Sequence, residues 1–533
     1  MNALLLGALV AAVLLSAIAR SRNISAPLTL MFAGLAAGLF PAVPDITLPP
    51  DLVLFVILPP LLWSAGLESS YINMRRNRRS IGLLAIGLPL ATAAAVGFVA
   101  YRSVPELTLA AAITLGAIVA PPDALSATAV GRQLRLPRRI MTLLGGESLL
   151  NDATALTAYK VALGAAIGTA ASWGERLATF AFTAVGGVVV GAVCGVVIVF
   201  IRARLNDALA ESAVGLVAPF LIYILAEKID GSGVLAVVVA ALILGHRFTR
   251  AAYATALQDR AVWRAVQLVL ESFVFLLIGL QLPMVVRELR GISVWTMAFS
   301  STAVLATVLA VRVVWVALFA YLPRLLSARV RDREPAPIPA QLVVLAWAGM
   351  RGVVSLAAAF GVPLTTLSGA RFPGRPQLVF LTFIVVVGTL LLHGLTLPWL
   401  IRKLGMHGHE TRSDALAEAA AQDKATRAAD ERLDEVLAAQ HAAAVRSDVH
   451  ERAADILRSW NMRRRDAAWE RLDRDDLDIG ESPAAAFREL RLEMLAAERE
   501  TLIAERDSGH IDDEVLRSML HGLDLEEATL NLG

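Results

Sequence analysis

The sequence predicts an all-α, multi-pass membrane protein with about thirteen transmembrane helices and a helical polar tail. Its 533 residues are 56% hydrophobic and only 18% charged, which is too apolar for a soluble protein of this length. Apolar segments of the length needed to cross a bilayer recur along residues 1–402. Basic residues gather in every second loop between them, as expected of a chain that crosses a membrane repeatedly.

The apolar segments account for nearly all of residues 1–402. The first could be mistaken for a signal peptide, but Arg20 and Arg22 follow its apolar run, so we interpret it as a membrane helix. The spans are expected at about 2–19, 25–42, 51–67, 80–101, 106–130, 138–167, 176–201, 209–227, 232–246, 264–286, 292–320, 340–362 and 377–401.

The loops indicate the orientation of the chain. Those after the odd-numbered spans are basic, whereas those between them are short and nearly neutral, with Arg287/Arg290 and Arg371/Arg375 as weaker exceptions. The positive-inside rule then places the N-terminus outside and the C-terminus in the cytosol of a plasma (inner) membrane protein. The basic loops contain Arg20/Arg22, Arg75 to Arg79, Arg132 to Arg139, Arg202/Arg204, Arg247 to Arg264, Arg324 to Arg333 and Arg402-Lys403.

The sixth span carries four polar residues at membrane depth. Glu147 and Asp152 are both ionisable, and such residues inside a membrane are costly and usually retained for a task. Ser148 and Asp152 are four residues apart and share a helix face, and Glu147 and Asn151 form a second such pair. One carboxylate can therefore line a cavity while the other pairs with a different helix.

Two spans are interrupted in the middle. The fifth contains Pro121 and Pro122, which remove two backbone donors, and the twelfth contains Gly349 and Gly352. Broken backbone at membrane depth is tolerated where protein buries it or where it lines a wet cavity. If spans one to six and eight to thirteen form two inverted repeats, both breaks fall in the fifth span of a repeat. That arrangement is typical of the binding site of a secondary transporter.

Five motifs in order carry a resemblance to a known family. They are Leu58-Pro-Pro-Leu-Leu-Trp-Ser-Ala-Gly66, Pro121-Pro-Asp-Ala124, Gly146-Glu-Ser-Leu-Leu-Asn-Asp152, Glu271 to Gly279 and Arg351-Gly-Val-Val-Ser355. With these motifs the chain resembles the monovalent cation:proton antiporter family, in its sodium/proton exchanger branch. The resemblance covers the whole membrane part, about three quarters of the chain.

The resemblance implies an ion and proton site on the sixth span. It makes Asp152 the carboxylate that alternately holds the cation and the proton, with Asp123 beside the crossing of the broken helices. Ser148 would offer its hydroxyl to the ion. Asn151 would be the neutral member of an Asn-Asp pair, so that one cation exchanges for one proton without net charge.

Other matching positions are expected to be structural or depart from the family pattern. The resemblance pairs Glu147 with Arg351, and Glu271 either caps its span or lines a pathway. Pro122 stands where many members have a threonine, and Ser64 stands where many have an acid. The coordination shell and the cation selectivity are therefore open.

The function that these observations favour is electroneutral antiport of Na⁺, or of K⁺ or Li⁺, against H⁺, serving pH and cation homeostasis. The alternatives are an anion transporter with a broken-helix site, a membrane-embedded acid/base enzyme and a cation channel. Three acids in two spans argue against an anion site, and the loops are too short for most enzymes of this kind. We expect no cofactor, no metal beyond the transported cation and no nucleic-acid partner, and the resemblance implies a homodimer.

The tail at about 403–533 differs from the rest in charge. It has 18 Lys+Arg against 30 Asp+Glu, whereas residues 1–402 have 31 against 17. Apolar residues at helical spacing predict helices over 489–503 and 513–523. Arg463-Arg464-Arg465 could touch anionic lipid, although a solvated face is commoner. We expect a cytosolic tail that regulates the membrane domain.

Overall fold

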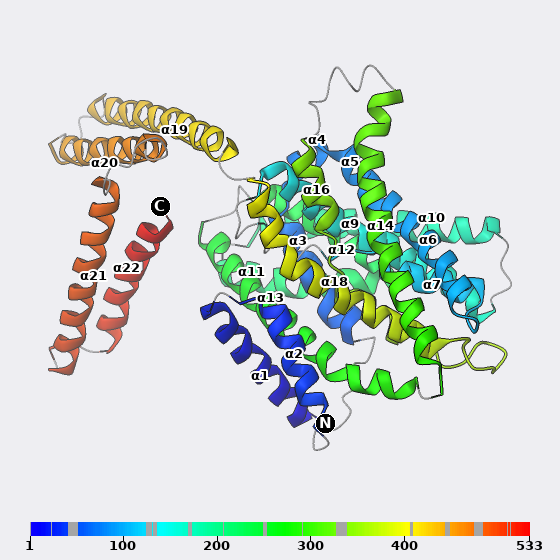
Figure 1. Cartoon of the computed structure of the whole chain (residues 1–533). Coiled ribbons are helices and arrows are strands. Elements are labelled where there is room, and N and C mark those ends of the chain that lie inside the picture. The colour runs from blue at the N-terminus through cyan, green and yellow to red at the C-terminus, as the bar shows by residue number, and fades with distance from the viewer. Residues whose placement is uncertain are drawn as a thin grey trace. The chain divides into compact units, whose positions relative to one another are not determined.

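In the computed structural model, helices are the regular secondary structure of the part of the chain that it describes, apart from one isolated bridge between Thr365 and Arg371 (Figure 1). The described residues are 2–22, 24–40, 52–123, 131, 136–168, 173–205, 207–248, 253–289, 291–326, 338–405, 409–442, 448–473, 483–508, 510–511 and 513–532. The chain divides into two compact units, Met1–Met406 and His407–Gly533.

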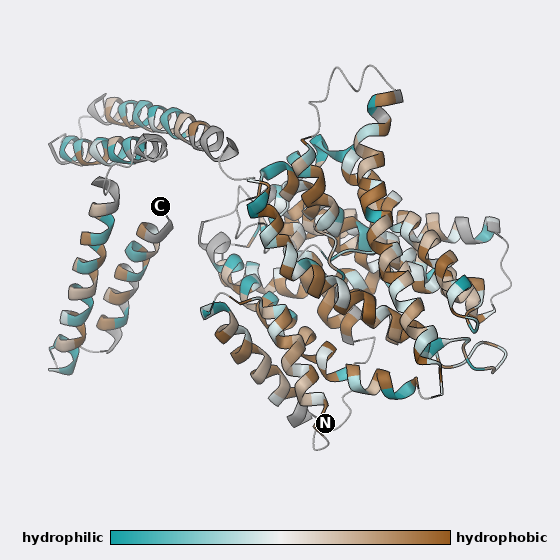
Figure 2. Ribbon diagram, in the orientation of Figure 1, coloured by the Kyte–Doolittle hydropathy of each residue, from teal (hydrophilic) through white to brown (hydrophobic). Residues whose placement is uncertain are grey.

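The first unit consists of helices with apolar surfaces, which are brown in Figure 2. Its elements are α1 (Asn2–Ser21), α2 (Ala26–Gly38), η1 (Leu52–Ile57), α3 (Leu58–Glu68), α4 (Tyr71–Arg76), α5 (Arg78–Gly82), η2 (Leu83–Gly87), α6 (Leu88–Ser103), α7 (Leu109–Val119), α9 (Arg138–Ile167), α10 (Trp173–Arg202), α11 (Ala208–Glu227), α12 (Gly233–Phe248), α13 (Tyr253–Glu288), α14 (Val294–Leu326), α16 (Pro339–Trp347), α17 (Val353–Phe360) and α18 (Arg375–Lys403).

Six described helical stretches are long and apolar enough to cross a membrane by length and composition, and five shorter apolar helices accompany them. The long ones lie in α5–η2–α6, α10, α11, α13, α14 and α18. The thirty-residue α9 is long enough but carries Glu147, Asp152 and Lys160, so its mean hydropathy is lower. The number of thirteen spans stays a prediction.

The helices of the first unit pack mainly within two groups. Helices α6, α7, α9, α14, α16, α17 and α18 contact one another, and α1, α2, α3, α10, α11, α12 and α13 form the second group. In the second group Gly34 of α2 meets Gly279 of α13, where a Cβ on either residue would overlap the backbone of the other helix. Small residues such as these let two helix backbones approach closely, which is a common way for helices to pack within a membrane.

The second unit contains two helical hairpins. Helix α19 (His409–Ala442) packs against α20 (Asp448–Asp473), and α21 (Pro483–Asp507) packs against α22 (Asp513–Leu532). Polar contacts join the second pair, where Arg491 and Glu526 lie 2.7 Å apart. This hydrogen bonding lowers the pKa of the Glu526 carboxyl below its ordinary value. The helices predicted over 489–503 and 513–523 fall within α21 and α22.

Candidate functional site

A cavity of about 750 Å³ lies between the two groups of helices. Helices α1, α2, α3 and α13 line one side of it, and α9, α17, α18 and the segment before Asp123 line the other. The lining brings together Asp123, Ser148, Asp152 and Glu271, which are distant in the sequence. No group of three or more His, Cys, Asp or Glu that could hold a metal ion occurs among the described residues.

Helix α9 divides its four polar residues between two faces. Ser148 and Asp152 line the cavity and are partly exposed to it. Glu147 and Asn151 are 1% and 0% exposed and do not line it. The division follows from the helical repeat, because residues four apart share a face. Asp152 is thus open to an arriving ion, whereas Glu147 is enclosed by protein.

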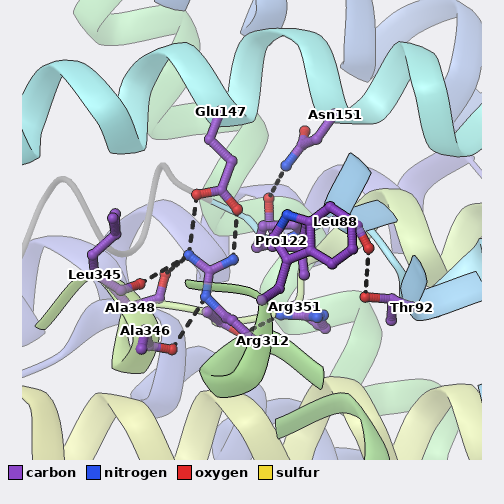
Figure 3. A network of polar contacts seen from close by, with 12 residues as sticks. Leu88, Thr92, Pro122, Glu147, Asn151, Arg312, Leu345, Ala346, Ala348 and Arg351 are labelled. Atoms are coloured by element: carbon purple, nitrogen blue, oxygen red, sulfur yellow. Dashed lines mark hydrogen bonds and ion pairs between the residues drawn. The ribbon is translucent and has the colours of Figure 1, made fainter. Parts of the chain in front are cut away.

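Two non-helical segments meet beside α9. Helix α7 ends at Val119, and the chain from residue 120 to Asp123 is not helical; residues 124–130 lie outside the described part. Residues 348–352 separate α16 from α17. The Asp123 backbone N–H donates to the Met350 carbonyl at 2.6 Å. The Asn151 amide donates to the Pro122 carbonyl at 3.0 Å, which ties α9 to the same crossing (Figure 3).

Gly352 allows this crossing to close. A Cβ at position 352 would lie 2.7 Å from the Asp123 Cβ and 2.9 Å from one of its carboxylate oxygens. Its φ of −128° is open to any residue, so the requirement for glycine is one of space. The absent side chain at position 352 therefore helps to set where the Asp123 carboxylate lies.

The expected ion pair between Glu147 and Arg351 is wrong, because Glu147 pairs with Arg312 of α14. The Arg312 Nη1 lies 2.5 Å from Oε1 of Glu147, and Nη2 lies 3.1 Å from Oε2, so the contact is bidentate (Figure 3). Both side chains are 2% exposed. Arg312 also donates to the carbonyls of Leu345, Ala346 and Ala348, at 3.1, 3.2 and 3.3 Å.

Arg351 instead donates hydrogen bonds to backbone carbonyls at the two helix breaks. Its Nε donates to the Val119 carbonyl at 2.9 Å and its Nη1 to the Gly349 carbonyl at 2.5 Å. A helix that stops inside a membrane leaves carbonyls without partners, and each such group is costly when buried. Arg351 satisfies carbonyls at the end of α7 and in the break after α16, which leaves Arg312 to face Glu147.

The sequence-based prediction left out Arg312 and gave Ser355 no role beyond its place in a motif. Arg312 could have been found, because it is an arginine in the middle of an apolar span and such residues are functional by default. Ser355 lines the cavity and is 1% exposed, and its hydroxyl has no hydrogen-bond partner among the described residues. It lies in the first turn of α17, and the residues three and four positions before it, Gly352 and Arg351, belong to the break and not to the helix.

Ser64, at the position where many relatives have an acid, has a different environment. Its hydroxyl donates to the Leu61 carbonyl of its own helix at 2.9 Å, and its side chain is 2% exposed. The cavity is lined by its neighbours Leu61, Leu62 and Ala65 but not by Ser64. No oxygen ligand for an ion is therefore supplied to the cavity from this position.

The family model described as "Sodium/hydrogen exchanger, transmembrane" matches residues 5–403. The chain belongs to this family. Membership makes the exchanger a multi-pass membrane protein and a secondary transporter for cations and protons, not an enzyme. An uncharacterized Na⁺/H⁺ exchanger of Mycobacterium tuberculosis is 33% identical, over 98% of this chain and 95% of its own length.

Two further comparisons place the exchanger among antiporters. The sodium, potassium, lithium and rubidium/H⁺ antiporter of Bacillus pumilus is 31% identical, over 71% of this exchanger and 58% of its own length. The sodium proton antiporter MjNhaP1 of Methanocaldococcus jannaschii, solved at pH 8, has a similar fold, with a TM-score of 0.59 and 20% identity. That likeness covers 75% of this exchanger and 97% of the solved chain.

Proposed function

We propose that the exchanger moves a cytosolic monovalent cation outward in exchange for an external proton, with Asp152 as the carboxylate that holds each in turn. The observation that carries this proposal is the position of Asp152 on the cavity between the two helix groups. One carboxylate has one negative charge, so a bound cation and a bound proton exclude each other. That competition couples the two fluxes.

The ion-binding oxygens come from three segments of chain. Ser148 lies one turn before Asp152 on the same face, Asp123 reaches the cavity from the crossing, and Ser355 adds an unpartnered hydroxyl. Asn151 acts indirectly, because its amide fixes the Pro122 carbonyl next to Asp123. With an amide rather than an acid at position 151, we expect one proton to replace one cation, so that the cycle is electroneutral.

The conformation described here is the inward-facing one in this proposal. The cavity is lined by Arg20 in the last turn of α1 and by Arg402 in the last turn of α18. The positive-inside rule assigns both helix ends to the cytosol, with the N-terminus outside and the protein in the plasma membrane. Movement of one helix group against the other would then expose Asp152 to the opposite side.

The finer architecture is also part of this proposal. Thirteen spans would form two inverted repeats, and the breaks after α7 and after α16 would be equivalent positions in them. The hydrogen bond between the two non-helical segments supports this pairing, since equivalent breaks are expected to meet at a repeat interface. Residues 403–533 would regulate transport from the cytosol, since residues 407–533 form a compact unit of their own that is polar and acidic.

Cation range and assembly follow from the family resemblance alone. We propose Na⁺ as a substrate and K⁺ and Li⁺ as candidates, and a homodimer as the state in the membrane. Proton flux in proteoliposomes driven by each alkali cation in turn decides the first point. Crosslinking in native membranes decides the second.

The Asp152→Asn variant tests the central residue. We expect it to insert and fold but to lose cation-coupled proton flux to the level of empty liposomes, because an amide can neither release a proton nor balance a cation. Asp152→Glu keeps the carboxylate and is the matched control, expected to retain part of the flux. Flux near the wild-type rate in purified Asp152→Asn would show that Asp152 is not the carboxylate that binds the cation and the proton.

A further inference from the structure

Helix α20 uses one face to pair with α19 and leaves the other uncovered. Arg458 lies 2.6 Å from Asp434 of α19, and Asn461 donates to Asp430 at 2.9 Å. Ala454, on the same side of α20, is 1% exposed. These contacts fix which side of α20 faces its partner helix.

The opposite side of α20 carries large apolar side chains in the open. Ile456, Leu457 and Trp460 are 60%, 50% and 62% exposed. Ile456 and Trp460 are four residues apart, so they form one stripe, and Leu457 lies between this stripe and the side that faces α19. Met462, which is 54% exposed, lies outside the stripe. Exposed apolar groups that gather on one face indicate an interaction surface, and tryptophan is favoured where an apolar phase meets water.

Arginines surround this stripe. Arg452 lies one turn before Ile456, and Arg463 and Arg464 lie about one turn after Trp460. Arg463 donates only to the Ser459 carbonyl and hydroxyl, at 3.3 and 3.5 Å. None of the three arginines has an ion pair with a carboxylate among the described residues. Their charges are available to an external anion.

We propose that this face of α20, defined by Arg452, Ile456, Leu457, Trp460, Arg463 and Arg464, docks on the anionic surface of the cytosolic leaflet. The apolar stripe enters the headgroup region, and the arginines lie against lipid phosphates. Only a short connection separates the membrane unit from the tail, because α18 ends at Lys403 and α19 begins at His409. The proposal rests on the cytosolic location of the tail.

The other hairpin of the tail shows why lipid is the occupant rather than any apolar partner. Helix α21 also exposes apolar residues, among them Phe487 and Leu490, at 55% and 67%. Residues 483–532, however, contain twelve Asp+Glu and five arginines, a net charge of −7, whereas residues 409–473 contain fourteen Asp+Glu and eleven Lys+Arg, a net charge of −3. Arg491 is paired with Glu526 and Glu498. An anionic surface therefore repels this hairpin more strongly than the α19–α20 hairpin, and the α20 face adds arginines that have no carboxylate partner, so charge separates two surfaces of similar apolarity.

The test places a fluorophore on each side of α20 in the full-length protein. In a Cys194→Ala background, Ala453→Cys lies on the proposed face, and Met462→Cys is an exposed control position rotated about 200° from Trp460. Each is labelled with an environment-sensitive dye and reconstituted in nanodiscs of phosphatidylcholine, with or without phosphatidylglycerol, carrying brominated acyl chains. We expect quenching at position 453 only, and only with the anionic lipid.

Charge variants measure the electrostatic part. Arg463→Gln with Arg464→Gln should lower the docked-to-free ratio roughly 25-fold, because each basic residue near an anionic surface contributes a factor of roughly five. The control Arg432→Gln removes an exposed arginine from α19 and should leave quenching unchanged. Equal quenching at 453 and 462, quenching without anionic lipid, or disulfide crosslinking between two copies at 453 in place of quenching would each overturn the proposal.

Discussion

At the residue scale, Arg312 does the most to hold the site together. Its guanidinium binds Glu147 of α9 with two hydrogen bonds and donates to three carbonyls at the end of α16, so that α14, α9 and α16 share one buried charge pair. A buried pair is a weak source of net stability, but removing one partner leaves a charge without compensation. The loss of either side chain should therefore cost more than the pair itself contributes.

We expect Arg312→Ala and Glu147→Ala each to destabilise the protein by about 3–5 kcal/mol. The double variant should lose much less than the sum, because no isolated charge remains. The measurement is a double-mutant cycle by thermal unfolding in detergent. The matched cycle with Arg351→Ala and Glu147→Ala should show weaker coupling than the first, because Arg351 donates to backbone carbonyls and not to Glu147. Strong coupling in the second cycle and additivity in the first would reverse the assignment of partners.

Ser355 should affect cation binding without affecting stability. Its hydroxyl has no hydrogen-bond partner among the described residues and binds the ion in our proposal, and a hydrogen-bond-like contact to a charged group contributes about 1.5–3 kcal/mol. Ser355→Ala is expected to raise the KM for the cation at least roughly tenfold at an unchanged melting temperature. Ser64→Ala removes a hydroxyl already bonded inside α3 and serves as the control. An unchanged KM in Ser355→Ala would remove Ser355 from the site.

Some features of the site could be predicted from the sequence and others could not, because the two kinds depend on different information. The neighbours Ser148 and Asp152 share a helix face by spacing alone, and the cavity contains both. The partner of Glu147 could not be obtained in this way, because Arg312 is 165 residues away and its choice depends on how three helices cross. Whether the Ser355 hydroxyl finds a hydrogen-bond partner depends on where α17 begins, and the apolar pattern does not specify that position.

At the scale of elements, the breaks after α7 and α16 work as a pair. Prolines end the first, and the second closes over Asp123 only because position 352 lacks a side chain. Prolines and glycines are readable in the sequence, so the positions of the irregular segments could be anticipated. Their contact through Asp123 and Met350 could not, because it depends on the packing of α7 against α17 and α18.

Gly352→Ala should displace the Asp123 carboxylate and lower exchange. The added methyl would overlap Asp123 at 2.7 Å, which is closer than real Cβ contacts come. We expect a loss of roughly tenfold or more in cation-coupled flux, because small misplacements of a working group are costly. In the control Gly82→Ala, the new methyl has nothing within 4 Å, and flux should be retained. Normal flux in folded Gly352→Ala would show that Asp123 tolerates the shift.

For the whole molecule, the cavity between two helix groups is the feature on which the proposed exchange mechanism depends. The acids of the site are divided between the groups, with Asp152 and Asp123 on one side and Glu271 on the other. Movement between the groups therefore changes the surroundings of Asp152 without dismantling either group. The apolar pattern predicts a membrane protein of many helices, but only the packing reveals which helices form each group.

Exchange should be electroneutral, because position 151 is an amide and Asp152 is the one acid of α9 on the cavity. Proteoliposomes clamped by a potassium gradient and ionophore test this, with sodium as substrate once potassium is known not to be transported. We expect an imposed potential to drive no sodium uptake and exchange to generate no potential. Uptake driven by the potential alone would identify a second titrating acid, and Asp123 would be the first residue to replace.

The contact between Glu147 and Arg312 also bears on how the protein is made. The two residues are 165 positions apart, so the ribosome needs roughly 10–30 seconds to reach Arg312 after it has added Glu147. During this interval α9 has an acid at membrane depth with no guanidinium to face. A nascent chain that stops before α14 should therefore hold α9 less firmly in the bilayer. We therefore expect the stable insertion of α9 into the bilayer to depend on the synthesis of a helix five elements later in the chain.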